Sequence, residues 1–79
     1  MKVMVKEGCR KSEKIKEWLK ITGLQVYAMP MDVDSWPVIA KGMNITDTPA
    51  LIDNNEKVHT KVDDIKNIVR SYAIECQNV

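Results

Sequence analysis

The sequence predicts a small α/β domain with a four-stranded mixed sheet and helices on both of its faces. Three observations lead to this fold class. The chain opens with an apolar β-type run, an amphipathic helical stretch and a second apolar run, which together form a βαβ unit. Two short apolar runs then flank an Asn-Asn pair, and a second amphipathic stretch follows. With 79 residues, the chain has the length of one domain, residues 1–79.

The first half of the chain supplies the βαβ unit. Residues 2–6 are of β type and predict a strand. The spacing of apolar residues predicts a helix over residues 10–22, and Gly23 is expected to end it. Its buried face is expected to consist of Ile15, Trp18, Leu19 and Thr22. Residues 24–29 predict the second strand, which Pro30 ends. Parallel pairing of the two strands follows, with a right-handed crossover.

A short helix is expected in the middle of the chain. Asp34 or Ser35 is placed to cap its start, and Pro37 fits its first turn. Gly42 is expected to end it. Five methionines in the chain are expected to fill gaps in the packing: Met1, Met4, Met29, Met31 and Met43.

The last third of the chain predicts a β-hairpin and a helix. Residues 50–53 and 57–60 flank Asn54-Asn55, a pair that tolerates left-handed turn geometry. The helix is expected over residues 62–75. The element order is therefore β-α-β-α-β-β-α. Helices must cover both faces of the sheet, because its strands carry apolar residues on both sides.

Composition and charge exclude several classes of function. The net charge of +1 comes from 12 basic and 11 acidic residues, which argues against nucleic acid or an anionic membrane as a partner. Acidic residues interleave with the lysines of the first helix, so its basic face is best explained as solvated. No apolar run approaches the ~18–20 residues of a membrane span, and no signal peptide is visible. We expect a cytoplasmic monomer whose cysteines are reduced, although a Cys9–Cys76 disulfide is the alternative.

Cys9 is the first candidate functional residue, because it lies where a strand gives way to a helix. Helix N-termini carry free N–H groups and a partial positive charge, which favour a thiolate. Lys6, Arg10 and Lys11 add positive charge beside it. Ser12 falls one turn along the helix, where its hydroxyl is placed to donate a hydrogen bond to the thiolate. The alternative is that Cys9 is a small buried hydrophobic residue.

Two segments resemble the thioredoxin superfamily, most closely its small glutaredoxin-like branch. Lys6-Glu7-Gly8-Cys9-Arg10-Lys11-Ser12 is similar to the glutaredoxin active-site segment, in which a lysine lies three residues before the nucleophilic cysteine and C-x-x-C or C-x-x-S follows. Residues 44–56, with Thr48-Pro49 before an apolar strand, are similar to the family's cis-proline segment. The resemblance implies a thioredoxin-like fold, a cis Thr48–Pro49 bond, and a groove in which the backbone at Thr48 pairs with an extended substrate. It also implies glutathione or a disulfide-bearing protein as the partner, and Lys6, Arg10 and Lys11 are expected to attract an anionic partner such as glutathione.

The chain departs from the family at three places. Ser12 replaces the second cysteine, residues 59–64 replace the Gly-Gly that helps hold glutathione, and Arg10-Lys11 replaces the Gly-Phe of the iron–sulfur monothiol members. Two hypotheses result. One is a monothiol thiol–disulfide oxidoreductase or electron carrier with Cys9 as nucleophile, no bound cofactor, and glutathione as a candidate reductant. The other is a protein-binding module that keeps the scaffold and has lost the redox role.

For the remaining candidate residues, the sequence favours structural roles over metal binding or catalysis. His59 is the only histidine, and its spacing from the two cysteines fits no metal site. Asp32 and Asp34 form a carboxylate pair, but a capping role suits Asp34 better. Cys76 is expected ~20 Å along the last helix from the site, too far for a disulfide within the chain.

Overall fold

The fold is a four-stranded mixed sheet with helices on both faces, seen in a computed structural model that describes residues 1–77. The strands are β1 (Lys2–Val5), β2 (Met29–Asp32), β3 (Ala50–Ile52) and β4 (Val58–His59). The helices are α1 (Arg10–Thr22), α2 (Pro37–Gly42) and α3 (Val62–Gln77), and a 3₁₀ turn, η1, spans Leu24–Val26. No helix among the described residues is long and apolar enough to cross a lipid bilayer.

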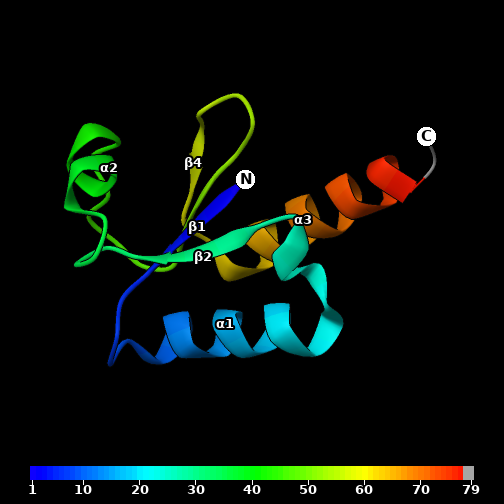
Figure 1. Cartoon of the computed structure of the whole chain (residues 1–79), viewed down its shortest axis with the longest axis horizontal. Coiled ribbons are helices and arrows are strands. Elements are labelled where there is room, and N and C mark those ends of the chain that lie inside the picture. Colours follow the sequence, from blue (N-terminus) through cyan, green and yellow to red (C-terminus); the bar gives the residue numbers. More distant parts are fainter. Residues whose placement is uncertain (78–79) are drawn as a thin grey trace.

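The strands lie in the order β2-β1-β3-β4 (Figure 1). β1 pairs with β2 in parallel and with β3 antiparallel, and β3 pairs with β4 antiparallel. The parallel pairing and the hairpin confirm the expected arrangement.

Successive side chains of β1 point to opposite faces of the sheet, which divides the core into two layers. Val3 and Val5 face α1 and α3, where they pack with Ile15, Leu19, Leu51, Ile65 and Val69. Met4 faces α2 and packs with Met31, Ala50 and Ile52. Helices therefore cover both faces of the sheet, as the apolar strands predict.

Helix α1 has the predicted bounds, and Gly23 ends it in the left-handed conformation with φ of 72°. A glycine adopts this conformation without the steric cost that a Cβ brings. Of the predicted face, Ile15 and Leu19 are fully buried, whereas Thr22 is exposed. Trp18 is half-buried, with Lys66 and Arg70 over its ring.

The prediction for the second strand is wrong. Residues 24–26 form the 3₁₀ turn instead, held by N–H groups of Tyr27 and Ala28 that donate to the carbonyl of Leu24. The strand begins at Met29 and includes Pro30. The N–H groups of Met29 and Val33 donate to the carbonyls of Met1 and Val5, so the nitrogen of Pro30 faces the free edge, where no ladder bond is lost. Met29 is 61% exposed, so it does not fill the core as expected.

The predicted cap of the short helix is also wrong. Trp36 occupies the N-cap position of α2, and no side chain bonds the helix end. Asp32 instead accepts a hydrogen bond from the N–H of Asp34 at 2.8 Å, which closes a turn before the helix. Pro37 lies in the first turn as predicted, and Gly42 is the last helical residue.

The hairpin strands are shorter than predicted, and α3 extends to Gln77. Asp53 organises the turn between β3 and β4: its carboxylate accepts N–H groups of Asn55 and Lys57 at 2.8 and 2.9 Å. The buried side of α3 is formed by Ile65, Val69 and Ala73.

Removing buried volume from α3 should destabilise the whole domain. Ile65 is fully buried, so Ile65→Ala should lower the free energy of unfolding by about 2–5 kcal/mol. Ile74 lies on the same helix and is 58% exposed, so Ile74→Ala should cost less than about 0.5 kcal/mol. Urea denaturation followed by tryptophan fluorescence measures both. Equal losses in the two variants would contradict the orientation of α3.

Candidate functional site at the start of helix α1

The sheet register brings two segments that are far apart in the sequence to the same end of the sheet. Met4 of β1 lies opposite Ala50, the first residue of β3. The chain that leaves β1 therefore runs beside the chain that enters β3. As a result, the Sγ atom of Cys9 lies 3.5 Å from the carbonyl oxygen of Thr48, although the two residues are 39 positions apart.

A tight turn places Cys9 at the N-cap of α1. The N–H of Cys9 donates to the carbonyl of Lys6 at 3.1 Å, and Gly8 between them has φ of 83°. This left-handed conformation is the reason that a glycine is suited to position 8. The carbonyl of Cys9 then accepts the N–H of Glu13 at 2.9 Å, which begins the helix. Cys9 is half-buried and is not in a disulfide.

Hydrogen-bond donors around the sulfur lower the pKa of Cys9 from 9.0 to about 7. The largest contribution comes from the hydroxyl of Ser12, followed by that of Thr48 and by the backbone N–H groups of Ser12 and Lys11. Burial of the thiol opposes them. Donors to a thiolate stabilise the charged form, whereas partial burial favours the neutral form. A substantial fraction of Cys9 is therefore ionised at neutral pH.

Ser12 is fully buried and has a second role in the turn. Its oxygen accepts the backbone N–H of Lys6 at 3.2 Å. A hydroxyl carries one hydrogen and two lone pairs, so accepting this bond leaves its hydrogen free for the sulfur of Cys9. Ser12 thus ties the end of β1 to α1 and also stabilises the thiolate.

Thr48 acts on Cys9 through both its backbone and its side chain. The thiol donates to the carbonyl oxygen of Thr48, and the Thr48 hydroxyl lowers the pKa of Cys9 by stabilising the thiolate. The Thr48–Pro49 bond is cis, as the family resemblance implies, and Pro49 is buried. The sequence singled out Thr48 for its backbone alone. Its hydroxyl was missed, and the only signal for it was the residue type at that position.

The sequence predicted that the charges of three basic side chains near Cys9 favour its thiolate, but these charges do not lower its pKa. Lys6, Arg10 and Lys11 are exposed. Their side-chain charges are not among the causes of the lowered pKa of Cys9, to which Lys11 contributes through its backbone N–H. Their remaining expected role is to attract an anionic partner.

The other candidates lie outside this site. His59 is 2.9 Å from the carboxylate of Asp53, and this contact lowers the pKa of Asp53. Cys76 is exposed, on the last turns of α3. Across residues 1–77, no group of three or more His, Cys, Asp or Glu side chains is arranged to hold a metal ion.

No protein-family model matches this sequence, and no curated protein or solved structure is a significant match.

Cys9 should be the faster-reacting thiol. Because its pKa is about 7, its reaction rate with iodoacetamide should rise with pH and reach half its maximum near pH 7. Between about pH 6 and 7, it should be modified before Cys76, as peptide mass spectrometry would show. A rate equal to or below that of Cys76 would contradict the activation of Cys9.

The two hydroxyls can be tested separately. Ser12→Ala and Thr48→Val each remove a donor to the thiolate, so each should raise the pKa of Cys9 and slow its alkylation at neutral pH by roughly two- to tenfold. Ser71→Ala removes an exposed hydroxyl on α3 and serves as the control. An unchanged pH midpoint in both site variants would mean that the helix N–H groups alone lower the pKa.

Proposed function

We propose that this chain is a small thioredoxin-like, glutaredoxin-like thiol–disulfide oxidoreductase that works through the single thiol of Cys9. The observation that carries the proposal is a pKa of about 7 for a cysteine at a helix N-terminus. Its position beside the cis Thr48–Pro49 segment and the β-α-β-α-β-β-α element order support the same assignment.

The reaction has two exchange steps. The thiolate of Cys9 attacks one sulfur of a substrate disulfide, a Cys9–substrate disulfide forms, and the second substrate sulfur leaves with the electron pair. An external thiolate then attacks the substrate sulfur of this mixed disulfide. Cys9 leaves as a thiolate and is regenerated, and the external thiol ends in a disulfide with the substrate. The external thiol is thereby oxidised and one sulfur of the substrate disulfide is reduced to a thiol, while the other sulfur stays in a disulfide with the external thiol.

The second thiol must come from another molecule. Ser12 occupies the position from which a second cysteine would resolve the mixed disulfide. Cys76 lies fourteen residues along α3 from Val62, about 21 Å at 1.5 Å per residue. In Figure 1, α3 runs from the middle of the molecule toward the C-terminus at the right, whereas α1 starts at the left. A disulfide needs Cα atoms within ~7 Å, so Cys76 is unsuited to this role.

Glutathione is the candidate external thiol. Lys11 lines a cleft of about 520 Å³ together with residues 60–64 at the start of α3. Lys61 and the carboxylates of Asp63 and Asp64 give this cleft both signs of charge. Glutathione carries carboxylates as well as an ammonium group, which matches a cleft of mixed charge. The backbone at Thr48 is the proposed strand-like contact for a protein substrate.

A protein-binding module is the second candidate, and Ser12 favours it. The Ser12 hydroxyl holds the N–H of Lys6, so it has a structural role that needs no redox chemistry. In this case the same groove docks a partner and Cys9 does not turn over.

Single substitutions separate these candidates. Cys9→Ser should abolish reduction of a disulfide substrate by glutathione, and Cys76→Ser should leave it nearly unchanged. With oxidised glutathione, intact-protein mass spectrometry should show one adduct that maps to Cys9. Ser12→Cys should permit an internal disulfide and raise activity with a dithiol reductant.

Two results would overturn the proposal or its geometry. A wild-type protein without activity, beside an active Ser12→Cys variant, would favour the binding module. Loss of turnover in Cys76→Ser would show that the two cysteines act as a pair and that α3 is misplaced.

A further inference from the structure

The β3–β4 hairpin is held by hydrogen bonds and hardly at all by the core. β4 has two residues, and its register with β3 has two residue pairs. Neither layer of the core includes any residue from 53 to 61, and residues 54–58 are exposed. A segment with few buried apolar contacts opens locally at a lower free-energy cost than unfolding of the whole domain. The strength of its hydrogen bonds therefore determines whether this hairpin is closed.

One carboxylate supplies three of these bonds. Oδ1 of Asp53 accepts the N–H groups of Asn55 and Lys57 at 2.8 and 2.9 Å. Oδ2 of Asp53 lies 2.9 Å from Nε2 of His59, so the carboxylate joins the turn to β4. Two main-chain bonds of 3.0 Å also close the turn, from the N–H of Asp53 to the carbonyl of Lys57 and from the N–H of Glu56 to the carbonyl of Asp53. Asp53 takes part in every one of these bonds.

The negative charge of Asp53 makes its side-chain bonds strong. Hydrogen bonds to an ionised carboxylate are stronger than those to a neutral group, and protonation removes this charge. The contact with His59, followed by the N–H of Lys57, holds the pKa of Asp53 below its ordinary value of 3.8. A carboxyl group with a lowered pKa in the folded state stabilises the fold above its ordinary pKa, and this contribution is lost as the pH falls through the lowered value.

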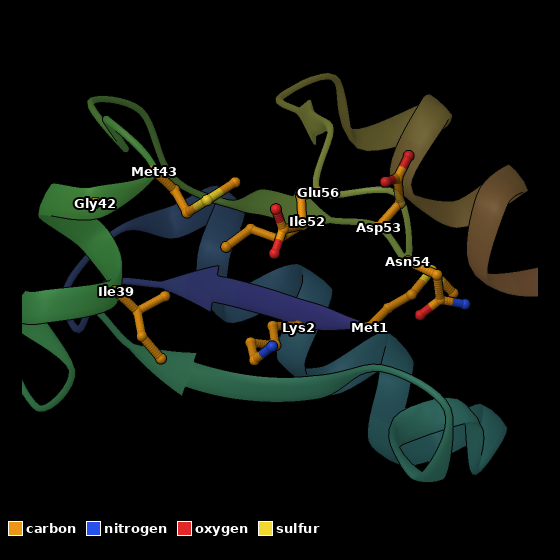
Figure 2. Close-up of a pocket in the computed structure, with 9 residues that line it drawn as sticks. All are labelled: Met1, Lys2, Ile39, Gly42, Met43, Ile52, Asp53, Asn54 and Glu56. Atoms are coloured by element: carbon orange, nitrogen blue, oxygen red, sulfur yellow. The ribbon is translucent and has the colours of Figure 1, made fainter.

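The other charged groups around Asp53 do not take the place of these bonds. The titratable groups that face it come from β1, the turn, β4 and α3: the ammonium of Met1, Lys2, Glu56, Lys57, His59, Tyr72 and Glu75. Among the described residues, only His59 forms an ion pair with Asp53. In Figure 2 the carboxylate of Asp53 points away from Lys2, whereas that of Glu56 points toward the cleft beside α2. His59 and the turn therefore determine how strongly Asp53 is held.

We propose that Asp53 is an acid-sensitive clasp on the β3–β4 hairpin: protonation of its carboxylate opens the turn and β4 while the rest of the domain stays folded. Opening exposes the main-chain groups of β3 that pair with β4. Asp53 follows the last residue of β3, whereas the contact between Cys9 and Thr48 lies before its first residue. The proposal is thus independent of the thiol chemistry.

NMR spectroscopy of the full chain between about pH 6 and 2.5 tests the clasp. The amide shifts of Asn55 and Lys57 should titrate together, with a midpoint below 3.8. The protection of the Asp53 amide against hydrogen exchange reports closure of the turn and should fall roughly tenfold through this midpoint, as expected for a shift of one pKa unit. The amides of Leu19 and Val69 in the core should keep their protection. An unchanged protection at Asp53, or an equal loss at the core amides, would overturn the proposal.

Three variants assign the effect to this carboxylate. Asp53→Asn keeps the shape of the side chain without the charge, so at pH 6 it should lower the protection at position 53 to about that of the wild type in acid. Asp34→Asn makes the same change on an exposed carboxylate and should leave the hairpin unchanged. His59→Leu removes the contact to Oδ2 and should raise the midpoint toward 3.8. A hairpin in Asp53→Asn as protected as that of the wild type at pH 6, or an unchanged midpoint in His59→Leu, would contradict the clasp. The wild-type titration decides the proposal even where Asp53→Asn lowers the stability of the whole domain.

Discussion

Burial of β1 on both of its faces is the constraint on which the rest of the structure depends. Val3 and Met4 are completely buried and Val5 nearly so, and successive side chains enter opposite core layers. Burial on both sides fixes the register, because a shift by one residue would exchange the two layers. The fixed register then places Cys9 beside Thr48 at the end of β1.

The thiol site depends on hydrogen-bond donors more than on side-chain charge. Donors in the first turn of α1 and the hydroxyl of Thr48 surround the sulfur, while the nearby basic side chains are exposed to solvent. Exposed charges are screened by water and salt, whereas a hydrogen bond in a half-buried site is screened much less. The chain from the N–H of Lys6 through Ser12 to Cys9 therefore links the end of β1 directly to the chemistry of the sulfur.

The sequence predicted elements well where a local signal and the tertiary packing agree. Helix α1 has apolar periodicity and a glycine stop, and its bounds are as predicted. The second strand was misplaced because Leu24 and Val26 suit a strand by type, yet residues 24–26 form a turn that leads α1 back to the sheet. Pro30 seemed to exclude a strand, but position 30 lies on a free edge, which only the sheet order reveals. Cys9, Ser12 and Pro49 were identifiable from their spacing, whereas the approach of Thr48 to the sulfur depends on the sheet register.

The position of Pro30 has a consequence for association between sheets. The outward side of β2 presents main-chain groups to solvent, and at Pro30 this side has no N–H to donate. A foreign strand that approached this edge would leave one of its carbonyls without a partner. The opposite edge is β4, which has only two residues and offers little length for pairing. Short edge strands and edge prolines are common protections against edge-to-edge aggregation. Both edges of this sheet therefore resist pairing with further strands. This feature disfavours aggregation of the protein at high concentration.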